Sequence, residues 1–179
     1  ILKTRKFGYD GKGQVKIESK KDVVGAIESF TGSDFILEGV VNFSKEISVI
    51  AARNSNGQIA CFDPGENIHI NGILDTTVVP CKLPRPIITD AILLTSSILE
   101  ALNYVGVLGV ELFVIKNKLI VNEIAPRVHN SGHWTQDGCI VDQFEQHIRA
   151  ISGWPLGDGS RFVNVTMKNL IGDDILAIS

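Results

Sequence analysis

The sequence predicts an α+β fold, in which mainly antiparallel strands and a few helices occupy separate stretches of the chain. Short β-rich runs follow one another between residues 35 and 62, with a tight turn signal among them. An amphipathic pattern with apolar residues at helical spacing lies between residues 88 and 102. Two more β-rich runs, 107–115 and 119–124, flank a short polar turn as the strands of a hairpin do.

The first thirty residues predict two strands, a loop and a helix. We expect Ile1–Thr4 to be a strand end and the glycine-rich run 8–13 to be a loop, because such a run holds no regular structure. Residues 14–18 alternate as a strand. A Ser-x-x-Asp pattern resembling a capping box then precedes apolar residues at helical spacing, so a helix is expected over residues 20–30.

The next part of the chain predicts an antiparallel meander. Strands are expected over residues 35–41, 46–53 and 58–62, with Asn54–Gly57 as a turn. Residues 63–75 combine three acidic groups with three glycine or proline positions, which favours a polar loop. Loops of this length are often functional.

The second half predicts two helices around the hairpin. The helix over residues 88–102 is expected to end near Tyr104 and Gly106. After the hairpin, residues 125–137 are expected to form another loop, followed by a helix over residues 143–151.

Composition excludes several classes of protein. With 44% hydrophobic and 21% charged residues and a net charge of −3, the chain has no basic field for nucleic acid. No run of about 18 apolar residues is present, so we expect no membrane insertion. The cysteines, Cys61, Cys81 and Cys139, show no paired metal spacing, which favours a reducing, cytoplasmic setting. The opening Ile1–Thr4, without methionine, leads us to expect an excised piece of a longer protein.

Two glutamates of the hairpin are candidate metal ligands. A tight turn centred on Asn117 places Glu111 opposite Glu123, since both are equally far from it. The same register pairs Phe113 with Val121 and Ile115 with Leu119. Two like charges at the end of an apolar face need a cation, and few hard oxygen ligands favour Mg²⁺, with Mn²⁺ as an alternative. Because Mg²⁺ is usually completed by phosphates, the pair indicates a nucleotide site.

The residues leave other interpretations of this pair open. The register can slip by one residue, or each glutamate can pair with a separate lysine or arginine. The glycine-rich loop is equally ambiguous: with Lys12, and with Lys3 before it, it can wrap phosphates, or it can be a mobile connector. It matches neither a Walker sequence nor a dinucleotide fingerprint.

The segment 127–135 packs a guanidinium, two imidazoles and small polar groups just beyond Glu123, a density that suits an anion or a polar ring. A zinc site formed by His129 and His133 is rejected, because the Asn-Ser-Gly run between them disfavours a helix. Simpler roles also stay open, namely a loop-anchoring hydrogen bond for His129 and a surface ion pair for Arg127.

Several motifs occur together in this chain: Lys3–Arg5, Gly8–Gln14, Gly106 and Val107 with Glu111, Asn122–Arg127 continuing through Gly132–Thr135, and Gln143–Ala150. Together they resemble the 5-(carboxyamino)imidazole ribonucleotide synthase family of the ATP-grasp superfamily. The likeness covers almost the whole chain. It implies an ATP-grasp fold, with mixed or antiparallel sheets, helices on one face, and ATP enclosed by two subdomains.

The resemblance also implies a domain organisation. Residues 1–157 would form an ATP-grasp domain that is incomplete at its N-terminus, and residues 158–179 would begin a small C-terminal domain. Because the family carries an N-terminal nucleotide-fold domain as well, we expect the isolated piece to turn over little. The parent enzyme is expected to be a homodimer.

The family reaction is the ATP-dependent formation of a carbon–nitrogen bond in purine biosynthesis. Bicarbonate attacks the γ-phosphate of ATP to give carboxyphosphate, and its carboxylate passes to the amine of 5-aminoimidazole ribonucleotide, leaving ADP and phosphate. The alternatives are another ATP-grasp carboxylase or ligase, and a non-catalytic nucleotide-binding module.

Motif by motif, the resemblance assigns roles to individual residues. It implies that Glu111 and Glu123 bind Mg²⁺. It implies that ATP is bound by Lys3, Gly11, Lys12, Gly13, Gln14, Glu38, Gly39, Glu46, His69 and Asn122, with Glu38 at the adenine and Glu46 at the ribose. The imidazole nucleotide would be bound by Tyr9, Asp10, Lys12 and Arg127. The site of bicarbonate and carboxyphosphate would be lined by Arg127, His129, Asn130 and Ser131. Ala125 stands where many ATP-grasp enzymes place an asparagine ligand, which favours the narrower family.

Overall fold

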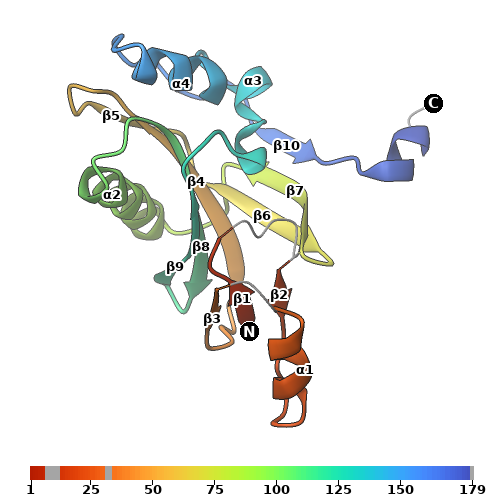
Figure 1. Ribbon diagram of the computed structural model, residues 1–179. Helices are drawn as coiled ribbons and strands as arrows, with labels where there is room; N and C mark the ends of the chain where they lie inside the picture. Colours follow the sequence, from red (N-terminus) through yellow and green to blue (C-terminus); the bar gives the residue numbers. More distant parts are fainter. Residues whose placement is uncertain (7–12, 31–33, 178–179) are drawn as a thin grey trace. The chain divides into compact units, whose positions relative to one another are not determined.

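The computed structural model describes residues 1–6, 13–30 and 34–177, which belong to two compact units (Figure 1). The first unit comprises residues 1–42 together with the short segment 69–73, and the second comprises residues 43–68 and 74–179. Strands and helices are largely segregated along the chain, so the predicted α+β class is confirmed.

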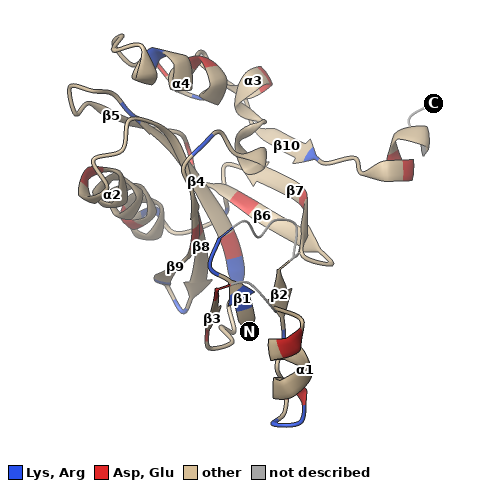
Figure 2. Ribbon diagram, in the orientation of Figure 1, with Lys and Arg blue, Asp and Glu red and all other residues tan. Residues whose placement is uncertain are grey.

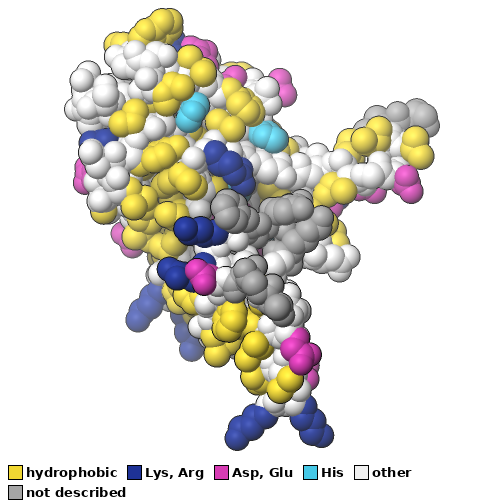
Figure 3. Space-filling model, in the orientation of Figure 1, with side chains coloured by type: hydrophobic (Ala, Val, Ile, Leu, Met, Phe, Trp, Pro, Cys, Tyr) yellow, Lys and Arg dark blue, Asp and Glu magenta, His cyan; other side chains and the backbone are white. Residues whose placement is uncertain are grey.

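A small antiparallel sheet forms the first unit. Strand β1 (Leu2–Thr4) lies between β2 (Gln14–Val15) and β3 (Phe35–Leu37), and helix α1 (Asp22–Glu28) follows β2 in the chain. The buried centre is small and comprises Leu2, Ala26 and Phe30, with Val15 and Ile17 packed against them. Apolar side chains also lie at the surface around β3 (Figure 3).

The first unit corrects two sequence expectations. The strand expected over residues 35–41 ends at Leu37 and pairs with β1, so it is not part of a meander with the following strands. The capping box forms only in part: the Asp22 carboxylate accepts hydrogen bonds from the backbone N–H of Ser19 at 2.7 Å and from its hydroxyl at 3.0 Å. The Ser19 hydroxyl therefore donates to the carboxylate instead of accepting from a helix amide.

A seven-stranded sheet forms the second unit. Its strand order is β10-β7-β6-β4-β8-β9, and β5 pairs with β4 beside this path. The strands are β4 (Lys45–Arg53), β5 (Ile59–Cys61), β6 (Gly65–Ile70), β7 (Ile73–Val79), β8 (Gly106–Ile115), β9 (Lys118–Ala125) and β10 (Val165–Lys168). Strand β4 runs antiparallel to β5, β6 and β8.

The helices of this unit are α2 (Arg85–Ala101), α3 (Thr135–Gly138) and α4 (Gln143–Ile151), with the 3-10 helices η1 (Asn130–Gly132) and η2 (Gly172–Ala177). Both longer helices were predicted from periodicity. Helix α4 starts where Asp142 accepts hydrogen bonds from the backbone N–H groups of Phe144 and Glu145, a regular N-cap. No helix in the described part of the chain is long and apolar enough to span a membrane.

The polar loop expected over residues 63–75 is wrong, because this stretch contains β6 and the start of β7. Asn71 and Gly72 join the two strands with φ angles of 53° and 79°, and Asn-Gly is the strongest short hairpin signal. The acidic residues and glycines around Asn71 and Gly72 led to the loop prediction instead. The hairpin tip, His69–Ile73, is grouped with the first unit.

Alternation along β4 divides the two faces of the large sheet. Its inner odd-numbered positions, Ile47, Val49 and Ala51, are fully buried in a core shared with α2 residues such as Leu99. Its even-numbered positions change character along the strand: Glu46 and Ser48 are polar, whereas Ile50 and Ala52 join a second apolar core. Half of one sheet face is therefore polar.

Other features of the second unit bear on its boundaries and charge. Strand β10 pairs with β7, so residues 165–168 belong to the large sheet. The domain boundary near residue 157 stays a prediction.

Lysines and arginines are spread over many elements of both units (Figure 2).

Candidate functional site

A row of three side chains crosses the polar half of the sheet. Ser48 of β4 pairs with Glu111 of β8, and Glu111 pairs with Glu123 of β9. Directly opposed residues point to the same face, and Glu46 shares that face because it lies two residues before Ser48. The sheet thus gathers three carboxylates on the face opposite to α2.

The predicted pairing of Glu111 with Glu123 is confirmed, but the rest of the predicted register is wrong. The turn consists of two residues, Lys116 and Asn117, with φ angles of 46° and 65°, and is not centred on Asn117. The observed pairs near it are Phe113 with Ile120 and Ile115 with Lys118. A register shift beside Glu111 inserts Asn122 as one extra residue in β9, which restores the glutamate pair.

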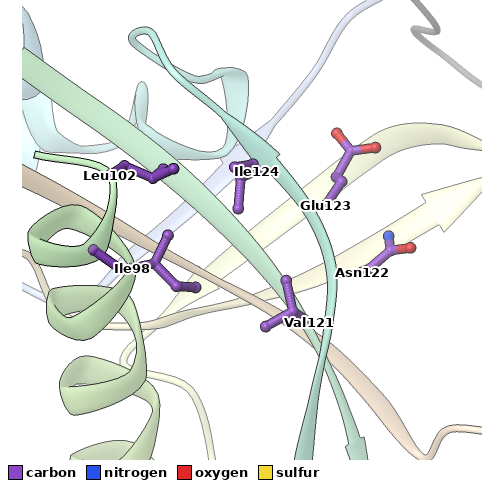
Figure 4. A pocket seen from close by; sticks show the side chains of 7 residues that line it. Ile98, Leu102, Val121, Asn122, Glu123 and Ile124 are labelled. Atoms are coloured by element: carbon purple, nitrogen blue, oxygen red, sulfur yellow. The ribbon is translucent and has the colours of Figure 1, made fainter. Parts of the chain in front are cut away.

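The bulge also changes where the side chains of β9 point. Val121 and Ile124 lie toward Ile98 of α2 and Leu102 at its C-terminal end, whereas Asn122 and Glu123 both lie on the other side of the strand (Figure 4). In a regular strand two successive residues point to opposite faces. The Asn122 amide nitrogen lies 3.5 Å from a Glu46 carboxylate oxygen, so the bulge adds an amide to the carboxylate group.

Glu111 is the centre of a candidate cation site. Its side chain is buried, with 8% of the residue exposed. Glu111, Glu123 and His129 each offer one ligand atom, and these atoms lie within 4.8 Å of one another. Glu46 likewise offers an oxygen within 4.8 Å of one from Glu111. Burying a carboxylate beside like charges is unfavourable unless a cation or a proton compensates it.

The donor set fits a divalent cation. Carboxylate oxygens from Glu111 and Glu123 are ligands that Mg²⁺ and Mn²⁺ prefer, and two such ligands leave coordination positions for phosphate oxygens and water. The imidazole of His129 adds a softer donor at the edge of the group. His129 was expected beside the bicarbonate, and its position against the Glu111 carboxylate was not foreseen.

His129 is held at both ends of its ring. The residue is 7% exposed, its Nε2 lies 3.7 Å from a Glu111 carboxylate oxygen, and its Nδ1 lies 2.8 Å from the Ser131 hydroxyl. Gly109 of β8 makes room for it, because a Cβ there would stand 2.9 Å from the His129 Cβ. The loop-anchoring role that the sequence left open for His129 is therefore present, together with a contact to Glu111.

The other candidates of this segment differ in exposure. Arg127 is exposed and donates through Nη1 to the Val128 carbonyl at 2.9 Å. Asn130 is half-buried at the start of η1. His133 is exposed and stacks on Phe144, with ring centroids 5.6 Å apart, and partial burial lowers the pKa of its imidazole.

Two candidates of the first unit contact each other. The Lys3 ammonium lies 2.8 Å from a Glu38 carboxylate oxygen, and the Glu38 carbonyl accepts from the N-terminal ammonium of Ile1 at 2.8 Å. The resemblance assigns Lys3 to phosphate and Glu38 to adenine. Phosphate binding by Lys3 would therefore compete with this ion pair.

The remaining candidates of the first unit are less informative. Gly13 has a φ angle of 74° and lies so close to Thr4 that a Cβ would stand 2.8 Å from its hydroxyl oxygen. Gln14 begins β2, Gly39 is exposed, and His69 is half-buried near the end of β6. The predicted site residues Tyr9, Asp10, Gly11 and Lys12 lie outside the described residues.

Sequence reasoning missed a buried polar group beside the carboxylates. Ser48, Asn67 and Thr77 are at most 6% exposed, and the Asn67 amide oxygen accepts from the Thr77 hydroxyl at 3.0 Å. Asn67 pairs with Glu46 across β4 and β6. The change from polar to apolar residues at even positions of β4 was a usable signal for this polar half-face.

Comparison with known proteins agrees with this geometry. Residues 1–144 match the ATP-grasp domain, so the chain belongs to the ATP-grasp family. Among curated relatives, the chain is similar to the N5-carboxyaminoimidazole ribonucleotide synthases of Brucella melitensis and Bacillus subtilis. The identities are 51% and 44%, each over 98% of this chain. These alignments cover 49% and 46% of the relatives, so the chain spans about half their length.

Solved structures give the same result. An ADP complex of purK, N5-carboxyaminoimidazole ribonucleotide synthetase, has a TM-score of 0.92 at 43% identity, covering 99% of this chain and 47% of that one. The Aspergillus clavatus N5-carboxyaminoimidazole synthase in complex with ADP and 5-aminoimidazole ribonucleotide has a TM-score of 0.89 at 28% identity. That match covers 98% of this chain and 48% of the other. The predicted family resemblance and ATP-grasp fold are confirmed.

Proposed function

We propose that this chain is the ATP-binding part of a ligase that carboxylates 5-aminoimidazole ribonucleotide with bicarbonate. In this reaction bicarbonate takes the γ-phosphoryl group of ATP to give carboxyphosphate and ADP. The carboxylate then passes to the exocyclic amine, releasing phosphate. The names of relatives up to 51% identical support this substrate, as does a related structure that holds ADP and the imidazole nucleotide.

The observation that carries the proposal is the carboxylate group around Glu111. Glu111 and Glu123 would hold Mg²⁺ or Mn²⁺, and the cation, when bound, supplies positive charge to the phosphate oxygens. Phosphoryl transfer needs positioning and charge neutralisation more than it needs a protein nucleophile. A compact set of carboxylates with one amide and one imidazole suits that chemistry.

The segment after β9 would serve the bicarbonate. The exposed guanidinium of Arg127 can make a bidentate contact with a carboxylate or phosphate group. His129, Asn130 and Ser131 would line the same side and orient the attacking oxygen. Because Ser131 bonds the far nitrogen of the His129 ring, the two residues act as a unit.

The remaining predicted residues would bind the two nucleotides. For ATP these are Lys3, Gly11, Lys12, Gly13, Gln14, Glu38, Gly39, Glu46, His69 and Asn122. Tyr9, Asp10, Lys12 and Arg127 would contact the imidazole nucleotide. Glu46 was assigned to the ribose, and its proximity to Glu111 and Asn122 supports a second contact, with the cation.

Assembly and location belong to the same proposal. The chain would work within a longer enzyme, of which residues 1–157 form the ATP-grasp domain, and that enzyme would be a cytoplasmic homodimer. All three cysteines are free, as expected in a reducing compartment.

Phosphate release tests the proposed function. The longer enzyme is assayed with MgATP and bicarbonate, with and without 5-aminoimidazole ribonucleotide. We expect release to rise with the imidazole nucleotide and to be lost in Glu111→Gln and Glu123→Gln. An intact protein that binds ATP but shows no stimulation would contradict the substrate assignment.

A further inference from the structure

Two glutamines of α4 make the same kind of contact with two different loops. Gln143 and Gln146 have no exposed surface. The Gln143 side-chain oxygen accepts from the His129 N–H at 2.9 Å, and its amide donates to the His129 carbonyl at 2.8 Å. Gln146 accepts from the Gly157 N–H at 2.8 Å and donates to the Gly157 carbonyl at 2.9 Å. Each side chain thus satisfies both backbone groups of one residue.

Gln143 is itself fixed at the start of α4. Its backbone N–H donates to the Thr135 hydroxyl at 3.0 Å, and that hydroxyl donates to the Gly132 carbonyl at 2.7 Å. The loop from His129 to Gly132 is therefore tied at both ends to residues whose own positions are set by short helices. All of these groups are buried, where breaking one bond leaves an unsatisfied partner.

The loop is tightly packed on both sides. A Cβ on Gly132 would stand 2.6 Å from the Gln143 side-chain oxygen and 2.8 Å from an Ile50 side-chain carbon. On the other side, the His129 ring carbons lie against Gly109 of β8. The path of the His129 backbone, and with it the distance from Nε2 to Glu111, follows from the Gln143 contact.

We infer that Gln143 is a positioning residue for the carboxylation reaction, because it holds the His129 imidazole against Glu111 through the His129 backbone. The inference rests on the proposed function in so far as His129 serves that reaction. It assigns Gln143 no contact with substrate. Gln146 is equally buried and makes the same pair of hydrogen bonds, but with Gly157, which lies in a different loop from His129. It therefore provides a matched control.

The test compares Gln143→Met with Gln146→Met in the full chain. Methionine keeps the length of the side chain and removes both hydrogen bonds in each case. The ring signals of ¹³C-labelled histidine are recorded by NMR, and the His129 signal is assigned by its loss in His129→Gln. We expect Gln143→Met to shift and broaden that signal and Gln146→Met to leave it in place.

Kinetics provide a second readout in the longer enzyme. We expect Gln143→Met to lower kcat on the order of 100-fold, the effect of a displacement of about 1 Å, with the KM for ATP changed by less than about threefold. Gln146→Met should keep kcat. If both variants change the His129 signal alike, or neither does, Gln143 is merely structural and the inference is overturned. If the unmodified enzyme shows no turnover, the proposed function fails, and the NMR comparison alone decides the positioning role.

Discussion

Glu123 lies opposite Glu111 because Asn122 adds one residue to β9. The pairs nearer the turn, such as Leu112 with Val121, would continue to Asn122 opposite Glu111 if the strands stayed in step. The bulge places the second carboxylate there instead and leaves the Asn122 amide on the same side, within 3.5 Å of Glu46. Bulges commonly re-aim side chains at functional sites in this way.

Changing Glu123 to glutamine should separate a metal site from a structural carboxylate pair. Without Mg²⁺, Glu123→Gln removes a like charge near buried Glu111, and we expect the free energy of unfolding to rise by roughly 1 kcal/mol. With Mg²⁺, we expect nucleotide affinity to fall at least about tenfold. Urea denaturation and nucleotide titration measure the two effects.

The matched control is Glu100→Gln, which removes an exposed carboxylate near the end of α2. It should change neither quantity. Unaltered Mg²⁺-dependent nucleotide binding in Glu123→Gln would mean that this carboxylate does not hold the cation.

Adding a methyl group at Gly109 should disturb His129. An alanine Cβ would stand 2.9 Å from the Cβ and 3.0 Å from the Cγ of His129. Overpacking of this kind costs about 1–3 kcal/mol of stability, and a displaced imidazole should lower turnover on the order of 100-fold. Thermal unfolding and phosphate release measure the two effects.

Gly159→Ala is the control for overpacking, since its Cβ would stand 2.9 Å from a ring carbon of Phe62, away from the carboxylates. We expect it to lose stability and keep turnover. Equal losses of turnover in both variants would show that overpacking alone, rather than the position of His129, lowers activity.

A glycine in α1 offers a stabilising substitution. Gly25 is exposed inside the helix, and a Cβ there would meet nothing within 4 Å. Gly25→Ala should stabilise α1 by about 0.5–1 kcal/mol, because alanine loses less backbone entropy in a helix. Gly13→Ala should do the opposite, since Gly13 combines a positive φ with close contact to Thr4. Hydrogen exchange of the α1 amides measures the first effect, and exchange of the Thr4 amide, which donates to the Gly13 carbonyl, measures the second. Faster exchange in Gly25→Ala would refute the helix assignment.

Two buried thiols should make stability depend on pH in the alkaline range. Burial raises the pKa of Cys81 and of Cys139 from 9.0 to about 11. The folded pKa lies above the unfolded one, so the thiols' contribution to stability is complete below pH 9 and is lost as the pH rises toward 11. In that window each thiol should lower the free energy of unfolding by up to about 1.4 kcal/mol per pH unit.

Urea denaturation under reducing conditions at several pH values measures this slope. The double variant Cys81→Ala with Cys139→Ala should show a shallower decline than the unmodified chain. Identical slopes would mean that neither thiol resists ionisation in the folded state. The raised pKa of Cys139 disfavours the thiolate that a nucleophilic cysteine needs.

Local patterns predicted the elements whose partners are near in sequence. The helices α2 and α4 and the hairpin of β8 and β9 follow from periodicity and a short turn. Within the predicted meander, β4 and β5 pair as expected. The first strand does not join them, because β3 pairs with β1, more than thirty residues earlier, and alternation within a strand does not identify a distant partner. The hairpin of β6 and β7 was missed although Asn71-Gly72 indicated it.

The candidate site was likewise predictable only where its residues are close together in the sequence. Glu111 and Glu123 belong to one hairpin, so their proximity followed from the sequence even though the turn and the bulge were wrong. The position of His129 did not follow, because it depends on an irregular loop held by Gln143, Thr135 and the space above Gly109. Contacts between side chains and distant backbone groups leave no periodic signal.

The most direct test of the proposed reaction is the transfer of ¹⁸O from labelled bicarbonate to phosphate in the longer enzyme, with MgATP and 5-aminoimidazole ribonucleotide. Attack of a bicarbonate oxygen on the γ-phosphorus carries that oxygen into the released phosphate, so we predict one ¹⁸O atom in each phosphate formed, and none in the absence of turnover. Phosphate without ¹⁸O, whose fourth oxygen comes from solvent, would show that water, not bicarbonate, attacks ATP, and would contradict carboxylation through carboxyphosphate.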